Sequence, residues 1–129
     1  MELASGRKES MKVFGNDYNT VDGTGVRDYV HVSDLATAHV KALDYLSLNK
    51  KCITLNLATG EGYSVLEVIK KAEEISGKSI TYDIGKRRPG DPAKLVATSK
   101  LAFDLLAWDP KYSSLETLLS SMWNIYKNE

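Results

Sequence analysis

The stretch Gly23–Val40, GTGVRDYVHVSDLATAHV, joins a glycine-rich loop, an arginine, an alternating run and a helical pattern. Val30 and Val32 alternate with Tyr29 and His31, which predicts a strand over residues 28–32. Ser33 or Asp34 is then placed to cap a helix. The helix has one apolar face, made of Leu35, Ala36, His39, Val40, Ala42, Leu43 and Leu46. A strand that leads into a helix indicates an α/β fold.

Further strand and helix patterns alternate on both sides of this stretch. Strands are predicted over residues 12–14, 52–57 and 79–85, with a very short one near 95–98. Ser64 and Glu67 form a capping-box pattern for a helix that ends at Gly77. A short helix is expected over 100–106, and a last one begins at a Ser113–Glu116 box and buries Leu115, Leu118, Leu119, Met122 and Tyr126. Residues 1–129 are thus expected to form a single α/β domain with about four helices.

Composition restricts the classes of partner. The 129 residues are 43% hydrophobic, and 17 basic side chains balance 17 acidic ones. This balance argues against nucleic acid and against a charged membrane surface, so any anion site must be built locally from a few arginines. The chain shows neither a signal-peptide pattern nor an apolar span of membrane length, so we expect a cytoplasmic protein. The lone Cys52 cannot form an internal disulfide and is expected to be buried or half-buried.

Two motifs suggest dinucleotide chemistry but fit it poorly. ATGEGYSV, residues 58–65, lies between a predicted strand and a helix, and Asp83 ends the next strand. However, Val65 stands where the third glycine of a dinucleotide fingerprint would pack against the strand. Tyr82 and Lys86 have the spacing of a catalytic Tyr–Lys pair, which requires a helix, whereas these residues flank a strand end and a glycine. A tight turn and an ordinary strand explain both motifs.

Two arginine-containing loops, GTGVRDY and KRRPGD, admit two interpretations. Arg27 and Arg88 could hold a diphosphate, since a guanidinium is a planar fork of donors, while Asp91 accepts from sugar hydroxyls. Alternatively, Arg27 pairs with Asp28 or Asp22, and Arg88 with Asp91, as surface salt bridges. Spacing alone leaves both open. His39, on the apolar helix face, is expected to be a core or boundary residue, and the role of His31 stays open.

Four segments together carry a family resemblance. They are VFGNDYNTVDGTGVRDYVHVSDLATAHVKAL, LNLATGEGYSVLEVI, KRRPGDPAKLVA and AWDPKYSSLETLLSSMW. From about Leu3 onward the chain resembles the C-terminal part of the UDP-glucose 4-epimerases, also called UDP-galactose 4-epimerases, which are extended short-chain dehydrogenases. The resemblance implies the α/β substrate-binding portion of such an enzyme, without its NAD-binding Rossmann half.

The resemblance also implies a UDP-sugar site. Arg27 and Arg88 match the arginines that hold the diphosphate, and Asp91 matches the residue that meets the uridine ribose. Lys12, Val13 and Phe14 match the segment along the uracil. Leu95 matches a position near the sugar, where its intermediate size leaves tolerance of N-acetylhexosamines open.

The family's other functional elements have no match here. The glycine-rich NAD fingerprint and the catalytic tyrosine and lysine are missing, so this chain alone is expected to bind no NAD and to be catalytically silent. In the complete enzyme, NAD takes a hydride from sugar C4 and returns it to the other face, which interconverts UDP-glucose and UDP-galactose in galactose metabolism. The 28–32 strand, its helix and the 52–57 strand would lie against the nucleotide-binding sheet. A separate N-terminal half, or a second copy in a homo-oligomer, would cover them.

Two other identities are compatible with the same residues. One is a non-catalytic remnant or self-associating interaction module. The other is a fragment of an enzyme that modifies a different nucleotide sugar, such as a dehydratase or decarboxylase.

Overall fold

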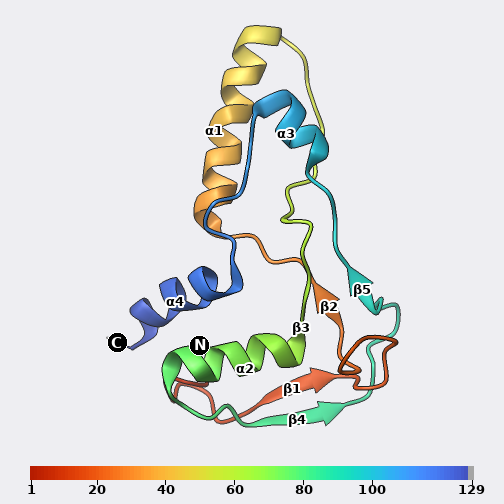
Figure 1. Ribbon diagram of the computed structural model, residues 1–129, viewed down its shortest axis with the longest axis vertical. Helices are drawn as coiled ribbons and strands as arrows, with labels where there is room; N and C mark the ends of the chain where they lie inside the picture. Colours follow the sequence, from red (N-terminus) through yellow and green to blue (C-terminus); the bar gives the residue numbers. More distant parts are fainter. Residues whose placement is uncertain (128–129) are drawn as a thin grey trace.

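The computed structural model describes residues 1–127, which form four helices and five short strands (Figure 1). In chain order these are β1 Met11–Phe14, β2 Val26–Arg27, α1 Val32–Asn49, β3 Tyr63–Ser64, α2 Val65–Ser76, β4 Tyr82–Gly85, β5 Lys94–Leu95, α3 Lys100–Leu106 and α4 Leu115–Tyr126. The predicted α/β class, with four helices and few strands, is confirmed.

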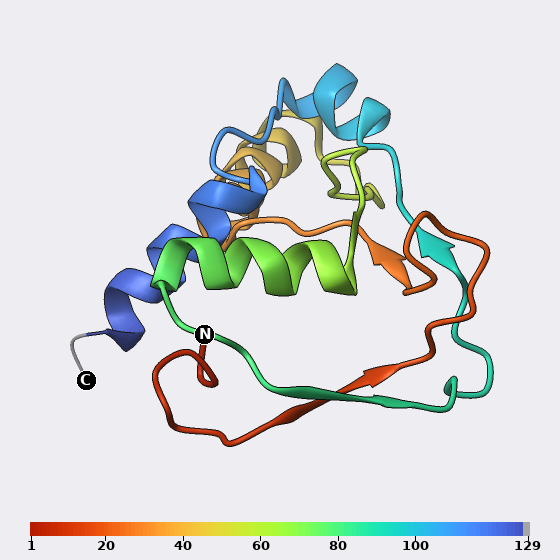
Figure 2. The same cartoon turned by 60° about the horizontal axis from the view of Figure 1, so that its bottom comes forward.

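The strands form two small sheets. β1 pairs with β4 in parallel, with Met11 opposite Tyr82 and Phe14 opposite Gly85. Figure 2 shows these two strands side by side beneath α2. In the second sheet, β2 lies between antiparallel β3 and parallel β5. The second sheet joins residues that are nearly seventy positions apart, and it therefore determines how the two arginine loops meet.

The core consists of two hydrophobic clusters. The first brings β1 against α2 and α4 and is built on Ala4, Val13, Ile69, Ala72, Ile80, Leu115 and Leu119. The second brings α1 against α3 and is built on Ala38, Ala102, Leu106 and Trp108. The Trp108 side chain is 1% exposed, and its indole N–H donates to the Asp34 carbonyl at 2.9 Å. No helix within residues 1–127 combines the length and apolarity needed to cross a bilayer.

Helix α2 follows its sequence signals closely. Ser64 accepts from the Glu67 amide, and the Glu67 carboxylate accepts in return from the Ser64 amide at 2.6 Å. This is the predicted capping box, which satisfies backbone donors at the helix start. The helix ends at Gly77, whose φ of 67° lies in the left-handed region that glycine adopts without strain.

The strand predicted over 28–32 is wrong. β2 ends at Arg27 and helix α1 already begins at Val32. Neither Ser33 nor Asp34 caps the helix, because His31 does so: its Nδ1 accepts from the Ser33 amide at 3.0 Å. The Asp34 carboxylate is instead buried against the segment that leads into α4. The alternation that indicated a strand thus belongs to an extended connection ending in a histidine cap.

The predicted apolar face of α1 is mostly exposed. The side that packs on α3 is centred on Ala38, while Val40 and Leu43 are 59% and 65% exposed. His39, expected at the core or its boundary, is also exposed, with Nδ1 2.7 Å from the Leu35 carbonyl. Helix α3 is short and packs against the side of α1 that carries Ala38. The exposed Val40 and Leu43 therefore have no packing partner within residues 1–127.

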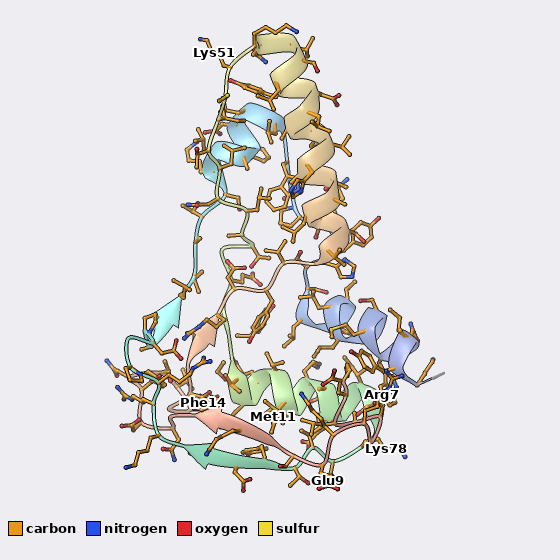
Figure 3. All side chains as sticks on the ribbon, turned by 180° about the vertical axis from the view of Figure 1, so that it is seen from behind. Arg7, Glu9, Met11, Phe14, Lys51 and Lys78 are labelled. Atoms are coloured by element: carbon orange, nitrogen blue, oxygen red, sulfur yellow. The ribbon has the colours of Figure 1, made fainter. Side chains whose placement is uncertain are left out.

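The strand predicted over 52–57 is also wrong. Ile53, Leu55 and Leu57 are half-buried and the residues between them are exposed, so the alternation is that of a strand. Within residues 1–127, however, no hydrogen bond engages the backbone of this segment. Figure 3 shows Lys51 near the tip of the molecule, where the segment starts down beside α1. Cys52, expected to be at least half-buried, is exposed.

Smaller differences concern α4 and the short strands. Ser114, not Ser113, caps α4 by accepting from the Thr117 amide, because the Ser113 hydroxyl donates to Asp34. Leu115 and Leu119 are buried as predicted, whereas Met122 is 43% exposed. The strand expected over 79–85 is shortened to β4, and the one near 95–98 is replaced by β5.

Candidate functional site

The second sheet brings the two arginine loops together. In its parallel register Arg27 lies opposite Leu95, four residues after Asp91. The Arg27 guanidinium donates through Nη2 to Asp91 Oδ1, and Arg88 donates through Nη2 to Asp91 Oδ2 at 3.0 Å. Hydrogen bonds from Arg88, and then from Arg27, hold the pKa of Asp91 below its ordinary value. We call Arg27, Arg88 and Asp91 the arginine cluster; it has two positive charges and one negative charge.

A tight turn places Asp91 within this cluster. The Asp91 amide donates to the Arg88 carbonyl at 3.2 Å, Pro89 takes the second position of the turn, and Gly90 has a φ of 78°. Proline followed by a residue with positive φ is the signature of a type II turn. The turn points the Asp91 carboxylate back at its own Arg88 and across to Arg27.

The loop before Arg27 is held by buried polar contacts. Asp22 accepts from the Thr24 amide at 2.9 Å, from the Thr24 hydroxyl at 2.7 Å and from the Ser64 hydroxyl. Burial raises the pKa of Asp22, but these hydrogen bonds together outweigh burial and lower the pKa. Gly23 has a φ of 80°, and a Cβ there would overlap the Asn16 carbonyl oxygen. These contacts attach the loop to the start of α2 and thereby fix the path of the chain into Arg27.

Arg27 is oriented by its own strand. Its Nη1 donates to the Val26 carbonyl at 2.7 Å, so the guanidinium folds back beside Gly25. A Cβ at Gly25 would lie 3.2 Å from that nitrogen, which explains why a glycine suits this position. The Arg27 side chain is only 22% exposed.

The salt bridges considered from spacing occur only in part. Arg88 pairs with Asp91, as that interpretation expects, but Arg27 pairs with neither Asp28 nor Asp22. Asp28 accepts instead from the Thr59 amide at 3.0 Å and the Gly60 amide at 3.1 Å. It thus anchors the ATGEGYSV loop.

The end of β1 adds an aromatic ring to the cluster. Phe14 is 38% exposed, and the Arg88 Cζ lies 4.9 Å from its ring centroid. Figure 3 shows Phe14 at the end of β1 away from Met11, towards the loops that lead to β2 and β5. The other predicted contacts of the nucleotide and sugar lie nearby. Val13 is 1% exposed and belongs to the core, so only its backbone can face a ligand. The aliphatic part of Lys12 lies over Gly85, where a Cβ would come within 2.6 Å of its Cε. Leu95, 61% exposed beside Arg27, is an apolar surface at the same site.

Sequence reasoning missed the role of the other arginine of KRRPGD. Arg87 stacks on the Tyr18 ring, with Cζ 4.1 Å from the centroid, and its Nε donates to Asp17 at 2.6 Å. Tyr18 is 5% exposed, and its hydroxyl has no hydrogen-bond partner within residues 1–127. Cation–π contacts of this kind fix a guanidinium over a ring. Arg87 therefore connects the loop after β1 to the loop after β4. The sequence signals for this contact were Tyr18 in the first loop and the adjacent Arg87 and Arg88 in the second.

The motifs that suggested dinucleotide chemistry serve the fold. Ser64 and Glu67 of the glycine-rich loop are occupied with capping α2 and with Asp22. Tyr82 lies in β4 with Lys86 just after the strand, so the two do not share a helical face. Within residues 1–127, no cluster of His, Cys, Asp and Glu side chains is arranged to hold a metal ion.

Comparison with known proteins supports the resemblance seen in the sequence. Residues 1–122 match the family model described as GDP-mannose 4,6 dehydratase. The chain is 48% identical over 122 residues to UDP-glucose 4-epimerase of Bacillus subtilis, and this covers 95% of the chain but 36% of that enzyme. The resemblance to UDP-glucose 4-epimerases is thereby confirmed.

Solved structures agree with the sequence comparison. UDP-glucose 4-epimerase from Stenotrophomonas maltophila, with bound NAD and formylated UDP-arabinopyranose, gives a TM-score of 0.92 at 42% identity over 98% of this chain and 38% of that one. The Bifidobacterium longum enzyme, with NAD+ and UDP, gives 0.90 at 42% identity, with 99% and 38% covered. The chain thus spans about two fifths of the length of these relatives, as expected for a C-terminal portion.

Proposed function

This chain belongs to the GDP-mannose 4,6 dehydratase family, and we propose that it is the UDP-sugar-binding, C-terminal part of a UDP-glucose 4-epimerase. The observation that carries the proposal is the arginine cluster, in which loops far apart in sequence present two guanidinium groups and one carboxylate beside Phe14. The solved structures of the Stenotrophomonas maltophila and Bifidobacterium longum enzymes contain formylated UDP-arabinopyranose and UDP, respectively.

The cluster has the chemistry for each part of a UDP-sugar. Arg27 and Arg88 donate charge-assisted hydrogen bonds to diphosphate oxygens. The Asp91 carboxylate accepts from ribose hydroxyls. The backbone of Lys12–Phe14 lies along the uracil, and Leu95 contacts the sugar. The size of Leu95 then limits how large a sugar substituent the site accepts. Titration with N-acetylhexosamine and plain hexose nucleotides measures this limit.

The described residues do not fit NAD. The ATGEGYSV loop has Val65 in place of a third glycine, its Ser64 is engaged in capping, and Asp83 lies on β4, in the other sheet. Tyr82 and Lys86 are not placed as a catalytic pair. We therefore propose that interconversion of UDP-glucose and UDP-galactose requires the NAD-binding portion of a complete enzyme, and that this chain alone binds substrate without turnover. A cytoplasmic location stays a prediction.

Titration with UDP-glucose, followed by amide NMR shifts, tests the proposal. We expect saturable shifts in β1, β2 and the 85–95 loop, which are lost in Arg27→Ala and in Arg88→Ala. Lys100→Ala removes an exposed cation of α3 and is the matched control. No shifts in a well-dispersed spectrum would refute substrate binding by this chain. NAD-dependent conversion of UDP-galactose by the pure chain would refute its silence.

A different nucleotide sugar would use the same arginine cluster, since the diphosphate is common to all of them. Ranking UDP-glucose against GDP-mannose in the same titration decides between an epimerase portion and a fragment of a related dehydratase. A preference for GDP-mannose would exclude the epimerase.

Self-association is a second candidate role, favoured by one specific surface. The exposed face of α1 with Val40 and Leu43, together with the unpaired backbone of residues 52–57, leaves apolar area and a strand edge uncovered. Such edges are templates for pairing with another chain. We propose that this surface is covered by an NAD-binding portion supplied as another chain, or by a second copy in a homo-oligomer. Sedimentation of dilute protein tests the second case: we expect a dimer that Leu43→Lys dissociates, and a stable monomer would contradict it.

A further inference from the structure

We propose that the Asp91 carboxylate stands in for ligand phosphate in the free protein, and that it makes the arginine cluster selective for diphosphates that carry a ribose over bare inorganic anions. The inference rests on the proposed function and concerns the same site. It assigns Asp91 a role in excluding anions, in addition to any contact with a bound nucleotide.

The geometry is that of an occupied anion site. Each Asp91 oxygen accepts from a different guanidinium: Oδ1 from Arg27 and Oδ2 from Arg88. Two adjacent phosphate oxygens would be held in the same way, because carboxylate and phosphate offer arginine similar pairs of acceptors. The donors that a diphosphate needs are therefore engaged with Asp91, and a ligand has to displace the carboxylate to reach them.

The carboxylate is held there by the backbone. The Arg88–Asp91 turn fixes its position from one side, and the pairing of β2 with β5 fixes Arg27 from the other. The Asp91 side chain is 18% exposed, less than a freely rotating surface aspartate would be. The other two carboxylates of the Arg27 loop are engaged elsewhere, Asp22 with Ser64 and Asp28 with Thr59. Within residues 1–127, Asp91 alone is seen to pair with both arginines.

Selectivity follows from what different ligands offer to the displaced carboxylate. An ionised carboxylate is only an acceptor, so it is satisfied by hydroxyl donors and repelled by phosphate oxygens. Pyrophosphate accepts the hydrogen bonds of both arginines and leaves Asp91 unpaired next to a second anion. A nucleoside diphosphate accepts the same hydrogen bonds, but its ribose hydroxyls donate to Asp91. The carboxylate thus penalises the first ligand more than the second.

Calorimetric titration of the wild type and three variants with pyrophosphate, UDP and UDP-glucose tests the inference. We expect Asp91→Asn to bind pyrophosphate about tenfold more tightly than the wild type, since removing one unit charge a few ångströms from the ligand changes affinity by about that order. The preference for UDP over pyrophosphate should fall by at least as much. Asp91→Glu, which keeps the charge, should restore the wild-type preference. Asp44→Asn, an exposed change on α1 with the same charge difference, should leave both affinities unchanged.

The outcomes separate the inference from the proposed function. If UDP-glucose binds in an Arg27-dependent way but Asp91→Asn binds pyrophosphate no more tightly, only the inference is overturned. If UDP-glucose does not bind but Asp91→Asn still gains pyrophosphate, the proposed function fails and the inference on anion exclusion stands. Binding of no ligand by any variant overturns both. If Asp91→Asn does not fold, the wild type decides: a preference for pyrophosphate over UDP overturns the inference, and the reverse preference supports it.

Discussion

Replacing Asp34 with alanine removes the carboxylate that ties α1 to the start of α4. The side chain is 1% exposed. Its Oδ1 accepts from the Lys111 amide at 3.0 Å, and its Oδ2 accepts from the Tyr112 amide at 2.8 Å and the Ser113 hydroxyl at 2.6 Å. Alanine leaves all three donors without their acceptor. The segment that they belong to connects the two hydrophobic clusters.

The magnitude follows from these contacts. A hydrogen bond to a charged acceptor contributes about 1.5–3 kcal/mol. The three bonds share one acceptor group and water will reach some of the donors, so they do not add fully. We expect Asp34→Ala to lower the free energy of unfolding by about 3–5 kcal/mol, a large part of the ~5–15 kcal/mol typical of a small domain.

Urea unfolding, followed by tryptophan fluorescence, measures the loss. Trp108 is a suitable probe because its indole N–H donates to the Asp34 carbonyl and its ring lies in the second cluster. Asp44→Ala, on the exposed side of the same helix, is the matched control and should change stability by less than about 0.5 kcal/mol. A loss below about 1 kcal/mol for Asp34→Ala would refute the argument that these hydrogen bonds join the two clusters.

The same carboxylate predicts an acid dependence. Burial raises the pKa of Asp34, but the hydrogen bonds from Ser113, Lys111 and Tyr112 together outweigh burial and lower the pKa below its ordinary value. The unfolded chain then binds the proton more readily than the folded one, so stability rises with pH in this range. The contribution is complete above the unfolded pKa of about 3.9 and is lost as the pH falls through the lower folded value. The wild type should therefore lose its advantage over Asp34→Ala on acidification below about pH 4; an advantage that grows there would contradict this sign.

Three further substitutions test single features of the fold. Gly23→Ala should destabilise the chain and weaken UDP-glucose binding in NMR titration, because its Cβ overlaps the Asn16 carbonyl. Gly60→Ala is the control, since Gly60 has the same φ of 80° but open space around it. This variant should lower the free energy of unfolding by only about 1 kcal/mol in urea. Ser64→Ala should cost about 2 kcal/mol in the same assay, since Asp22 loses a donor and α2 its cap; an unchanged midpoint would rule this out. Trp108→Phe should cost about 2 kcal/mol in thermal unfolding, and a smaller loss than about 0.5 would show that its indole hydrogen bond is dispensable.

Sequence reasoning was most successful where a structure depends on residues close together in the chain. The capping box of Ser64 and Glu67, the glycine end of α2 and the bounds of α3 all appear as predicted. The cap of α1 was missed because any of His31, Ser33 and Asp34 could supply it locally. The distant Ser113, 79 residues from Asp34, decides which residue caps the helix, because its hydroxyl and the neighbouring amides of Lys111 and Tyr112 bind the Asp34 carboxylate.

The arginine cluster shows the same boundary between local and distant information. Spacing singled out Arg27, Arg88 and Asp91 but left open which of the acidic residues each arginine pairs with. The pairing of β2 with β5 decides it, by bringing Asp91 to Arg27 across the sheet. Asp28 and Asp22 are nearer to Arg27 in sequence, yet both hold loops that come from the other side of β2. No property of the residue types in GTGVRDY predicts this choice.

The segment 52–57 shows what a strand requires beyond its own residues. Its side chains already alternate, with Ile53, Leu55 and Leu57 turned towards α1 and Ala38, and this burial is enough to hold the backbone extended. The hydrogen bonds of a ladder need a second backbone at about 4.8 Å, which no part of residues 1–127 provides. The exposed Val40 and Leu43 lie on the helix beside this segment. We propose that a second chain covers both the apolar helix face and the open strand edge, and pairing with it would complete the strand that the sequence pattern predicts.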